Sequence, residues 1–567
     1  MNELSKKVQE SEWIGTIGSP STNTRLNVDI LEEAYEKGLV GKFCTVEFLQ
    51  NEKAAFAIGQ IASVARVNPY LERHSVRKIT SIRGEANPLT AKHDVQTVEL
   101  IIGSVYENDK GDIKPTVIGT VPPTGTRVYS LNQEVVDELT EKYSNEITYV
   151  GKMYNTNILL PTLFRHFGKG PRGLGEAYHI GIFGKTGSGK SYLARMIMLA
   201  YAQHPEMSLL IIDPMGEYAR EAQKAGPMIK VLKELDKPLK IFGISNISLA
   251  ESESLRRILM RTRFFNELGI PSEEYQLNAA FLVKQFFEAH RTGVTTLHGV
   301  VPLNNPAALD QLLNYIRLNV QRIYVSPEPR NRVLDRIANN RNVLERIWNS
   351  VIPLFVLEQG KIRLEDLINE ICTSPSFCII DLSEPSSGNY FWNDEVMAIV
   401  LCEILAGLKE TGNQFYRSDR LLNLLIMTDE AHRFVPREKP AIEEFFLLKK
   451  AFIDGIRETR KYGLGWFFVS QSIASLDFEI LRQLRLYFFG YGLAWGGELR
   501  ALVDLVGRGG HLDLYQSFTD PQTSLSGEKT YSFMAYGPVS PLSASGAPLF
   551  LDALNYFKEF GNTLLKY

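Results

Sequence analysis

Short apolar runs alternate with amphipathic stretches over most of the chain beyond residue 150. Residues 180–183, 209–212 and 421–428 are largely apolar, which is typical of strands buried on both faces of a sheet. The stretches between such runs place apolar residues at helical spacing, as Leu193 and Ile197 do. We therefore expect an α/β fold in which helices cover both faces of a parallel sheet.

The first 150 residues show a different pattern, in which β-branched and aromatic runs are broken by glycine, proline, asparagine and aspartate. Such runs predict short strands, and short strands separated by turn residues favour a small β-barrel. A hairpin is expected across the charged turn 107–114. Nothing in this segment looks catalytic, so we interpret it as a docking or assembly module. The expected strands are 14–22, 42–49, 54–67, 97–106 and 115–125.

A third pattern, amphipathic throughout, lies between two of the core strands. It predicts helices at 254–268, 273–291, 309–324 and 332–352, which we interpret as a helical insertion with a solvated, arginine-rich surface. A DNA-binding face is the less favoured alternative. The predicted parts are a barrel (1–150), the first core segment (151–248), the insertion (249–372), the second core segment (373–530) and a tail (531–567).

Composition adds few constraints to this picture. The chain has 567 residues, 44% hydrophobic and 22% charged, which suits a globular protein of two or three domains. Its net charge of −3 gives no global basic field, although a ring can still concentrate basic side chains on its inner surface. No apolar run approaches the roughly 18 residues that a membrane span requires. Scattered cysteines without paired spacing further favour a reducing, cytoplasmic location.

Candidate chemistry begins with a glycine-rich loop that follows the strand 180–183. The sequence GKTGSGKS fits G-x-x-x-x-G-K-[ST], a loop whose backbone N–H groups cradle phosphate at the start of a helix. Lys190 is expected to reach the β- and γ-phosphates and Ser191 to ligate Mg²⁺, so ATP and Mg²⁺ are the predicted cofactors. The loop consists of Gly184, Lys185, Thr186, Gly187, Ser188, Gly189, Lys190 and Ser191.

Two later strands also end in polar residues that suit phosphoryl transfer. The run 421–428 leads directly to Asp429 and Glu430. Asp429 is expected to hold the Mg²⁺ shell, and Glu430 to orient or deprotonate the attacking water. Gln471 ends the apolar run of GLGWFFVSQS, where an amide can sense the γ-phosphate; a plain strand-end cap is the alternative.

These motifs, in this order, resemble those of HerA, the hexameric DNA translocase family of the HerA/FtsK superfamily. The resemblance rests on IGIFGKTGSGKS, LLIIDPMGEY, IMTDEAHRF and RKYGLGWFFVSQS. It implies a RecA-like P-loop ATPase core, a leading small β-barrel, a helical insertion and a tail that braces the adjacent subunit. Asp213 and Glu217 match the acids of the family's D-P-x-G-E-Y segment, in which Met215 stands where histidine is usual.

The same resemblance implies an arginine finger. Arg460, and Arg457 one turn earlier, match the region that supplies a guanidinium to the neighbouring subunit. Such a cation stabilises the charge that builds on the γ-phosphate and makes hydrolysis depend on assembly. The alternative is that both arginines pair with Glu458 or Asp454 on an exposed helix.

DNA contacts are expected in the loop after the acidic pair, HRFVPREKPA. It carries Arg433, Arg437 and Lys439, and mobile basic side chains suit contacts with phosphates on any sequence. An ordinary solvated loop is nearly as well supported.

The function implied by the resemblance is a homohexameric ring that hydrolyses ATP to translocate along double-stranded DNA. A separately encoded effector is expected on the barrel, either a nuclease or a sirtuin-like NADase, in antiphage defence. The alternatives are DNA end resection with a NurA-like nuclease, a ring that binds ATP only as a scaffold, and a secretion or conjugation ATPase.

Overall fold

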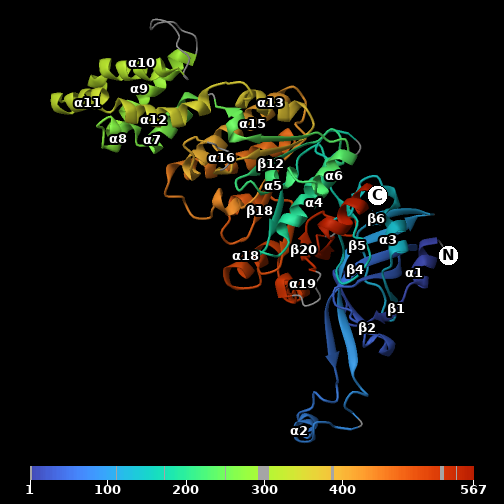
Figure 1. Cartoon of the computed structure of the whole chain (residues 1–567). Helices are drawn as coiled ribbons and strands as arrows, with labels where there is room; N and C mark the ends of the chain where they lie inside the picture. Colours follow the sequence, from blue (N-terminus) through green and yellow to red (C-terminus); the bar gives the residue numbers. More distant parts are fainter. Residues whose placement is uncertain are drawn as a thin grey trace.

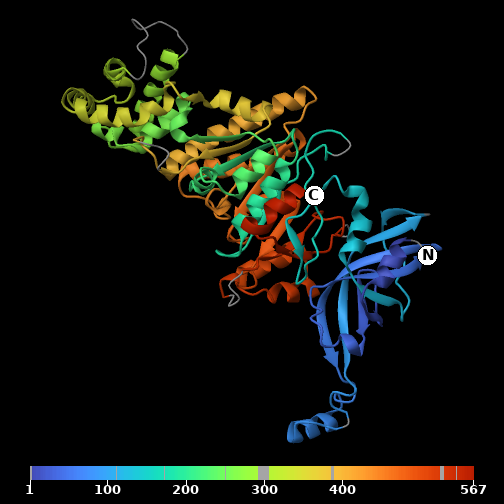
Figure 2. The same ribbon diagram turned by 45° about the vertical axis from the view of Figure 1, so that its right-hand side comes forward.

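The computed structural model describes residues 3–87, 89–109, 111–170, 173–249, 251–291, 305–384, 389–523, 529–543 and 546–566. The chain forms an N-terminal barrel, a core built on a large sheet, and a bundle of helices (Figure 1). The barrel and the helical bundle lie at opposite ends of the core, as the turned view also shows (Figure 2). The N-terminus lies on the barrel, and the C-terminus lies between the barrel and the core.

The N-terminal strands close into a six-stranded antiparallel barrel, as predicted. The neighbour order is β2-β1-β7-β3-β4-β5, and the ring closes because β2 also pairs with β5. A further strand, β6 (Asp112–Thr116), forms a hairpin with β5, but residues 107–109 and 112–114 of the expected turn are themselves paired, and residues 117–125 of the expected strand lie outside any strand. The barrel strands are β1 (Trp13–Ile17), β2 (Arg25–Ile30), β3 (Phe43–Gln50), β4 (Lys53–Val67), β5 (Val95–Asp109) and β7 (Arg127–Ser130).

Two features of the barrel were not predicted from the sequence. Strands β2 and β7 are short and carry as many polar as apolar residues, so only their partners reveal them. Strands β4 and β5 also continue beyond the barrel as an arm that ends in helix α2 (His74–Arg83) (Figure 1). None of the residues of α2 is buried.

The core sheet has ten strands in the order β13-β16-β12-β17-β18-β11-β19-β20-β21-β9. The first seven run parallel, which confirms the predicted parallel sheet, and the last three are antiparallel. The parallel strands are β11 (Ile180–Phe183), β12 (Ser208–Asp213), β13 (Leu239–Gly243), β16 (Phe377–Asp381), β17 (Leu424–Thr428), β18 (Leu464–Ser470) and β19 (Leu486–Gly490). The antiparallel strands are β9 (Gly151–Met153), β20 (Ser532–Tyr536) and β21 (Leu549–Ala553).

The C-terminal segment packs on the core of its own chain. Strands β20 and β21 extend the sheet from β19, and β21 pairs with β9, which directly follows the barrel segment. The last helix, α20 (Gly561–Lys566), lies against α6 (Pro227–Glu234). The expected contact of the tail with a neighbouring subunit stays a prediction.

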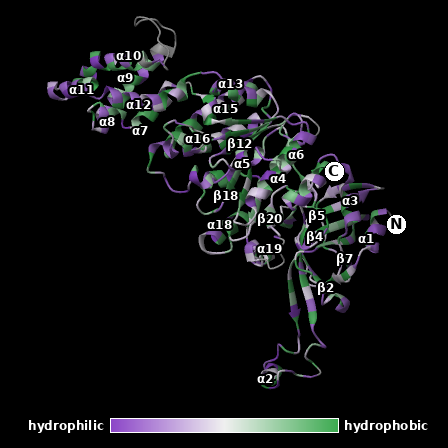
Figure 3. Ribbon diagram, viewed as in Figure 1, coloured by the Kyte–Doolittle hydropathy of each residue, from purple (hydrophilic) through white to green (hydrophobic). Residues whose placement is uncertain are grey.

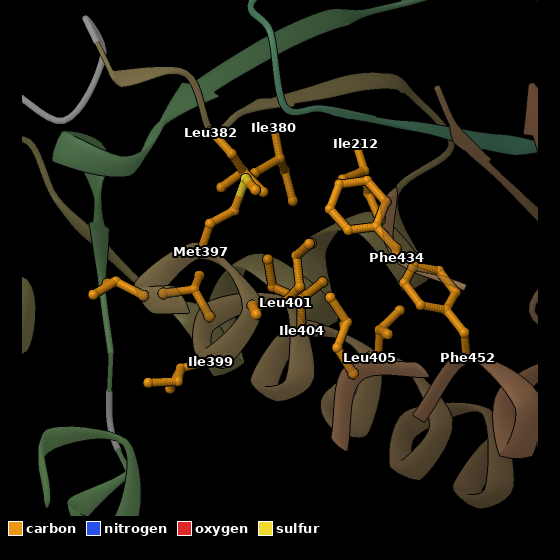
Figure 4. Close-up of a cluster of buried hydrophobic side chains, with 14 of the residues drawn as sticks. Ile212, Ile380, Leu382, Met397, Ile399, Leu401, Ile404, Leu405, Phe434 and Phe452 are labelled. Atoms are coloured by element: carbon orange, nitrogen blue, oxygen red, sulfur yellow. The ribbon is translucent and has the colours of Figure 1, made fainter. Parts of the chain in front are cut away.

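Helices cover both faces of the parallel strands because successive strand residues point to opposite sides. Ile212 and Ile380 belong to the cluster on one face, where α15 (Asp394–Arg417) brings Leu401 and Ile404 against them (Figure 4). Their neighbours Ile211 and Ile379, together with α4 (Lys190–Ala202), belong to the cluster on the other face. Burying each such side chain contributes about 1.5–3 kcal/mol. The second helix on the α15 face is α16 (Glu443–Thr459).

The helical insertion follows the short strand β14 (Ile247–Ser248); its partner strand β15 (Ile362–Arg363) precedes the last helix of this part. The helix expected at 309–324 ends at Leu318, before a short 3₁₀ turn at Val320–Arg322, and two other helices predicted as continuous are broken. Thr262 ends the first, since its hydroxyl donates to the Leu259 carbonyl and accepts from the Phe264 N–H. Asn340 ends the other and donates to Glu267.

The helices of the insertion are α7 (Ser252–Arg261), α8 (Phe264–Glu267), α9 (Glu273–Arg291), α10 (Pro306–Leu318), α11 (Pro327–Asn339), α12 (Arg341–Val351) and α13 (Leu364–Thr373). Coloured by hydropathy, the outermost helix α11 is mostly hydrophilic (Figure 3), in agreement with the solvated surface expected for this part.

A buried glutamine joins the barrel to the core. Gln60 of β4 is 6% exposed; its Oε1 accepts from the Phe550 N–H at 2.9 Å and its Nε2 donates to the Gly41 carbonyl at 2.7 Å. Both backbone groups are thereby satisfied where water is excluded.

Gln60→Leu is expected to destabilise the chain by about 2 kcal/mol, because it leaves the Phe550 N–H and the Gly41 carbonyl without partners. The temperature of the first unfolding transition in calorimetry should fall. The exposed Gln9→Leu, also in the N-terminal part, serves as control and should leave that temperature unchanged. An equal effect of both variants would contradict the role of Gln60 at the junction.

Candidate nucleotide-binding site

Four adjacent strands of the sheet, β12, β17, β18 and β11, end at the same edge. Because they are parallel, the residues that follow them meet around a single cavity of about 840 Å³. The structure therefore brings most of the predicted site residues together. Those that line the cavity are Thr186, Gly187, Gly189, Lys190, Ser191, Asp213, Glu217, Asp429, Glu430, Arg433 and Gln471.

The phosphate loop has a backbone that favours glycine. Gly187 and Gly189 have φ of 83° and 88°, a left-handed conformation in which a β-carbon is strained. At Gly184, the first residue of the loop, a β-carbon would be 2.7 Å from the Ser188 Oγ. Helix α4 begins at Lys190, directly after the left-handed Gly189, so its free N–H groups face the loop.

The polar groups inside the loop fit a phosphate. Lys190 is 7% exposed, and its Nζ donates to the Lys185 carbonyl at 3.0 Å. Burial lowers the pKa of Lys190, while Glu430 and Asp429 raise it and so favour the charged form. The buried Ser188 Oγ has no hydrogen-bond partner among the described residues, which leaves a donor available within the loop.

The acidic pair at the end of β17 is held by two hydrogen bonds. Asp429 accepts from the Tyr218 hydroxyl at 2.8 Å and from the Glu430 N–H at 2.7 Å. Burial raises the pKa of Asp429, and the bond from Tyr218 lowers it. Glu430 has φ of 49°, an uncommon value for a residue with a side chain, which turns its carboxylate toward β18.

Gln471 connects the acidic pair to the phosphate loop. Its Nε2 donates to Glu430 Oε1 at 2.9 Å, and its Oε1 accepts from the Thr186 hydroxyl at 2.9 Å. The Gln471 side chain therefore couples the position of Thr186 in the phosphate loop to that of Glu430. The expected role of Gln471 in sensing the γ-phosphate stays a prediction.

The Asp213 carboxylate is hydrogen-bonded to backbone N–H groups of the following helix. It is 1% exposed, and its two oxygens accept from the N–H groups of Glu217 and Ala219 at 3.1 and 2.9 Å, at the start of α5 (Glu217–Ala222). Burial raises the pKa of Asp213 to about 6. The Glu217 side chain is exposed at the cavity wall.

The predicted arginine fingers are not among the residues that line the cavity. Arg460 precedes β18, and its carbonyl accepts from the N–H of Ala177, which precedes β11, so it lies at the amino edge of the sheet. Its guanidinium pairs with Glu176. Arg457 pairs with Glu479. The alternative that both arginines pair with Glu458 or Asp454 on the same helix is therefore wrong in its partners, which come from distant segments, and the finger itself stays a prediction.

The basic loop after the acidic pair makes contacts within its own chain. Arg433 lines the cavity, where it pairs with Asp394 at 3.1 Å and approaches Met215 Sδ at 3.3 Å. The other two basic residues lie over aromatic rings, Arg437 over Phe478 and Lys439 over Phe446, each at 5.2 Å. Their contact with DNA stays a prediction.

Sequence reasoning missed several side chains of the cavity. Tyr218 could have been found, since it completes the D-P-x-G-E-Y segment next to Glu217. Arg195, which pairs with Glu221, and the aromatic residues Tyr531 and Phe557 could not. The last two reach the cavity only because the C-terminal segment folds back onto the core.

The sequence of residues 177–390 matches the family model described as the central domain of the helicase HerA. This segment is therefore similar to HerA, over less than half of the chain. It includes the phosphate loop and Asp213, whereas Asp429, Glu430 and Gln471 follow it on later strands of the same sheet. The match agrees with a P-loop ATPase fold. None of the curated proteins matches the chain.

Solved structures similar to this chain share little sequence with it. VirB4 of Thermoanaerobacter pseudethanolicus is 15% identical, covers 72% of this chain and 96% of its own, and has a TM-score of 0.40. The genome packaging NTPase B204 from Sulfolobus turreted icosahedral virus 2, with ATP-gammaS, is 10% identical over 67% and 98%, at 0.29. The pCW3 conjugation coupling protein TcpA, a monomer form with ATPgS, is 11% identical over 92% and 91%, at 0.26.

Within the described ranges of the chain, no helix is both long and apolar enough to cross a membrane.

Asp213 gives a pH-dependent contribution to stability. Its pKa rises from 3.8 to about 6 in the folded chain, so the folded state holds the proton more tightly than the unfolded state. The stabilisation is present below the unfolded pKa and is lost as pH rises through about 6. The free energy of unfolding in urea is measured for the wild type and for Asp213→Asn. The wild-type value minus the variant's value should fall by up to about 3 kcal/mol as pH rises across this range. A difference independent of pH would contradict it.

Proposed function

We propose that this chain is an ATP-driven motor that moves along double-stranded DNA as a homohexameric ring in the cytoplasm. The observation that carries the proposal is the hydrogen-bonded path from Thr186 through Gln471 to Glu430, which connects the phosphate loop to the acidic pair across one cavity. Such a path suits an enzyme whose hydrolytic residues must respond to the γ-phosphate.

In this proposal the loop N–H groups and Lys190 bind the β- and γ-phosphates, and Ser191 and Asp429 hold Mg²⁺. Magnesium supplies neutralisation of the negative charge on the phosphate oxygens. Glu430 orients the attacking water and accepts its proton, while Gln471 keeps the Glu430 carboxylate directed at the loop. The Tyr218 hydroxyl holds Asp429 in place by donating a hydrogen bond to its carboxylate.

Arg460 acts, in this proposal, on the nucleotide of an adjacent subunit. It lies at the amino edge of the sheet, whereas the cavity of its own chain lies at the carboxyl edge. A ring in which one subunit's amino edge faces the next subunit's cavity would bring the guanidinium to the γ-phosphate. Glu176 would hold it in place until assembly.

We further propose that the barrel docks a separately encoded effector, a nuclease or a sirtuin-like NADase acting in antiphage defence. The barrel supports this as a compact module at the opposite end of the core from the insertion, with an exposed arm (Figure 1). Arg437 and Lys439 are the proposed contacts with DNA phosphates. Isolating the chain with a NurA-type partner would favour end resection instead.

Glu430→Gln is expected to lower ATP turnover by at least about 100-fold, because it removes the group that accepts the proton of water. Nucleotide binding should persist. Turnover is measured with and without linear double-stranded DNA, with the exposed Glu438→Gln of the following loop as the control that keeps wild-type turnover. Equal ATP turnover of the wild type with and without DNA would argue against a DNA motor. Full biological activity of Glu430→Gln would instead support a scaffold ring.

Mixing two inactive variants tests Arg460 in trans. Arg460→Ala and Glu430→Gln should each be inactive, yet an equal mixture should regain about a quarter of wild-type turnover, from sites that take Glu430 from one subunit and Arg460 from the next. A mixture of Lys190→Ala with Glu430→Gln is the control: both residues line the same cavity, so no intact site forms. An inactive first mixture, or an active Arg460→Ala, would refute the finger.

A further inference from the structure

One wall of the nucleotide cavity is aromatic, and the phosphate chemistry does not account for it. Tyr192, Tyr531 and Phe557 line this wall. The ring centroid of Tyr192 lies 5.7 Å from that of Tyr531 and 5.6 Å from that of Phe557, the latter in an edge-to-face arrangement at 77°. The wall therefore joins a residue of α4 to two residues of the C-terminal segment.

The wall is held at a fixed place beside the phosphate loop. The Tyr531 ring lies against Gly189, where a β-carbon would be 2.5 Å from the ring. The Tyr531 carbonyl accepts from the Ala553 N–H at 2.8 Å, which anchors it to the end of β21. The Asn555 side chain accepts from the Phe557 N–H at 3.1 Å and so fixes the turn that presents this phenyl ring.

Phe557 differs from the aromatic residue before it. Tyr556 is 3% exposed, and its hydroxyl donates to Glu221 at 2.7 Å, so it belongs to the packing of the segment. Phe557 is 64% exposed although it is apolar and borders the cavity. Leaving a phenyl ring in water costs free energy that a planar apolar partner would recover.

The position of the wall indicates which part of a nucleotide it would meet. Tyr192 directly follows Ser191, at the start of the helix that receives the phosphates. The γ-phosphate end is defined by Glu430 and Gln471, which are bonded to each other. The nucleoside must extend from the other end of the triphosphate, and the aromatic wall is the apolar part of the cavity lining next to Ser191.

We propose that Tyr531 and Phe557 form the nucleobase subsite, in which the base stacks on their rings. This rests on the proposed binding of ATP and adds the residues that bind its base. The rings contact the π-face of the base. Because every base has a π-face, stacking alone does not select one base over another. It also makes the C-terminal segment part of the nucleotide site of its own chain.

The test compares ATP with inorganic tripolyphosphate, which offers the same loop a chain of phosphates without a base. Dissociation constants of both are measured by calorimetry on the full chain with Mg²⁺. Phe557→Ala should weaken ATP about tenfold or more and leave tripolyphosphate unchanged, because only ATP loses stacking. Phe557→Trp should retain ATP affinity. Tyr70→Ala, an exposed aromatic on the barrel arm, is the control and should change neither constant.

Each outcome separates the inference from the proposed function. A wild type that binds neither ligand would overturn the proposed ATP site itself. A wild type that binds ATP, with Phe557→Ala unchanged, would overturn the subsite and leave the ATP site standing. Equal weakening of ATP and tripolyphosphate would also overturn it, since the wall would then support only the phosphate loop.

Discussion

The parallel hydrogen-bonded register of β12, β17, β18 and β11 is the constraint on which the site depends. Each strand places its chemical groups at or just beyond its last residue, so the distances between these groups are set by backbone pairing. A slip of one residue would turn each buried side chain to the other face of the sheet. The hydrophobic clusters on both faces oppose such a slip and thereby fix the geometry of the cavity.

Placement by the sheet is combined with a strained residue and a bridging amide at its edge. Glu430 adopts a backbone conformation that costs free energy for a residue with a side chain, and Gln471 is bonded to both Glu430 and Thr186. The strained residue and the bridging amide are thus coupled to the loop that receives phosphate. Local strain of this kind persists only where the surrounding structure over-determines it.

Sequence reasoning was most successful where one short segment carries its own signal. The apolar runs of β11, β12 and β17 and the glycine spacing around Lys190 are local, so the sheet and the phosphate loop could be predicted. Strands β2 and β7 have weak local patterns and pair with distant strands, β2 with β5 and β7 with β3. The partners of Arg460 and the place of Phe557 depend on segments hundreds of residues away, which spacing alone does not reveal.

The pairing of β9 with β21 has a consequence for how the chain is made. Residues 151–153 pair with residues 551–553. During synthesis on the ribosome, this edge of the core sheet cannot form until nearly the whole chain has emerged. Until then the edge of β9 remains open, and contacts of such long sequence separation form slowly. The barrel, whose strands all precede residue 131, has no such delay and is free to close first.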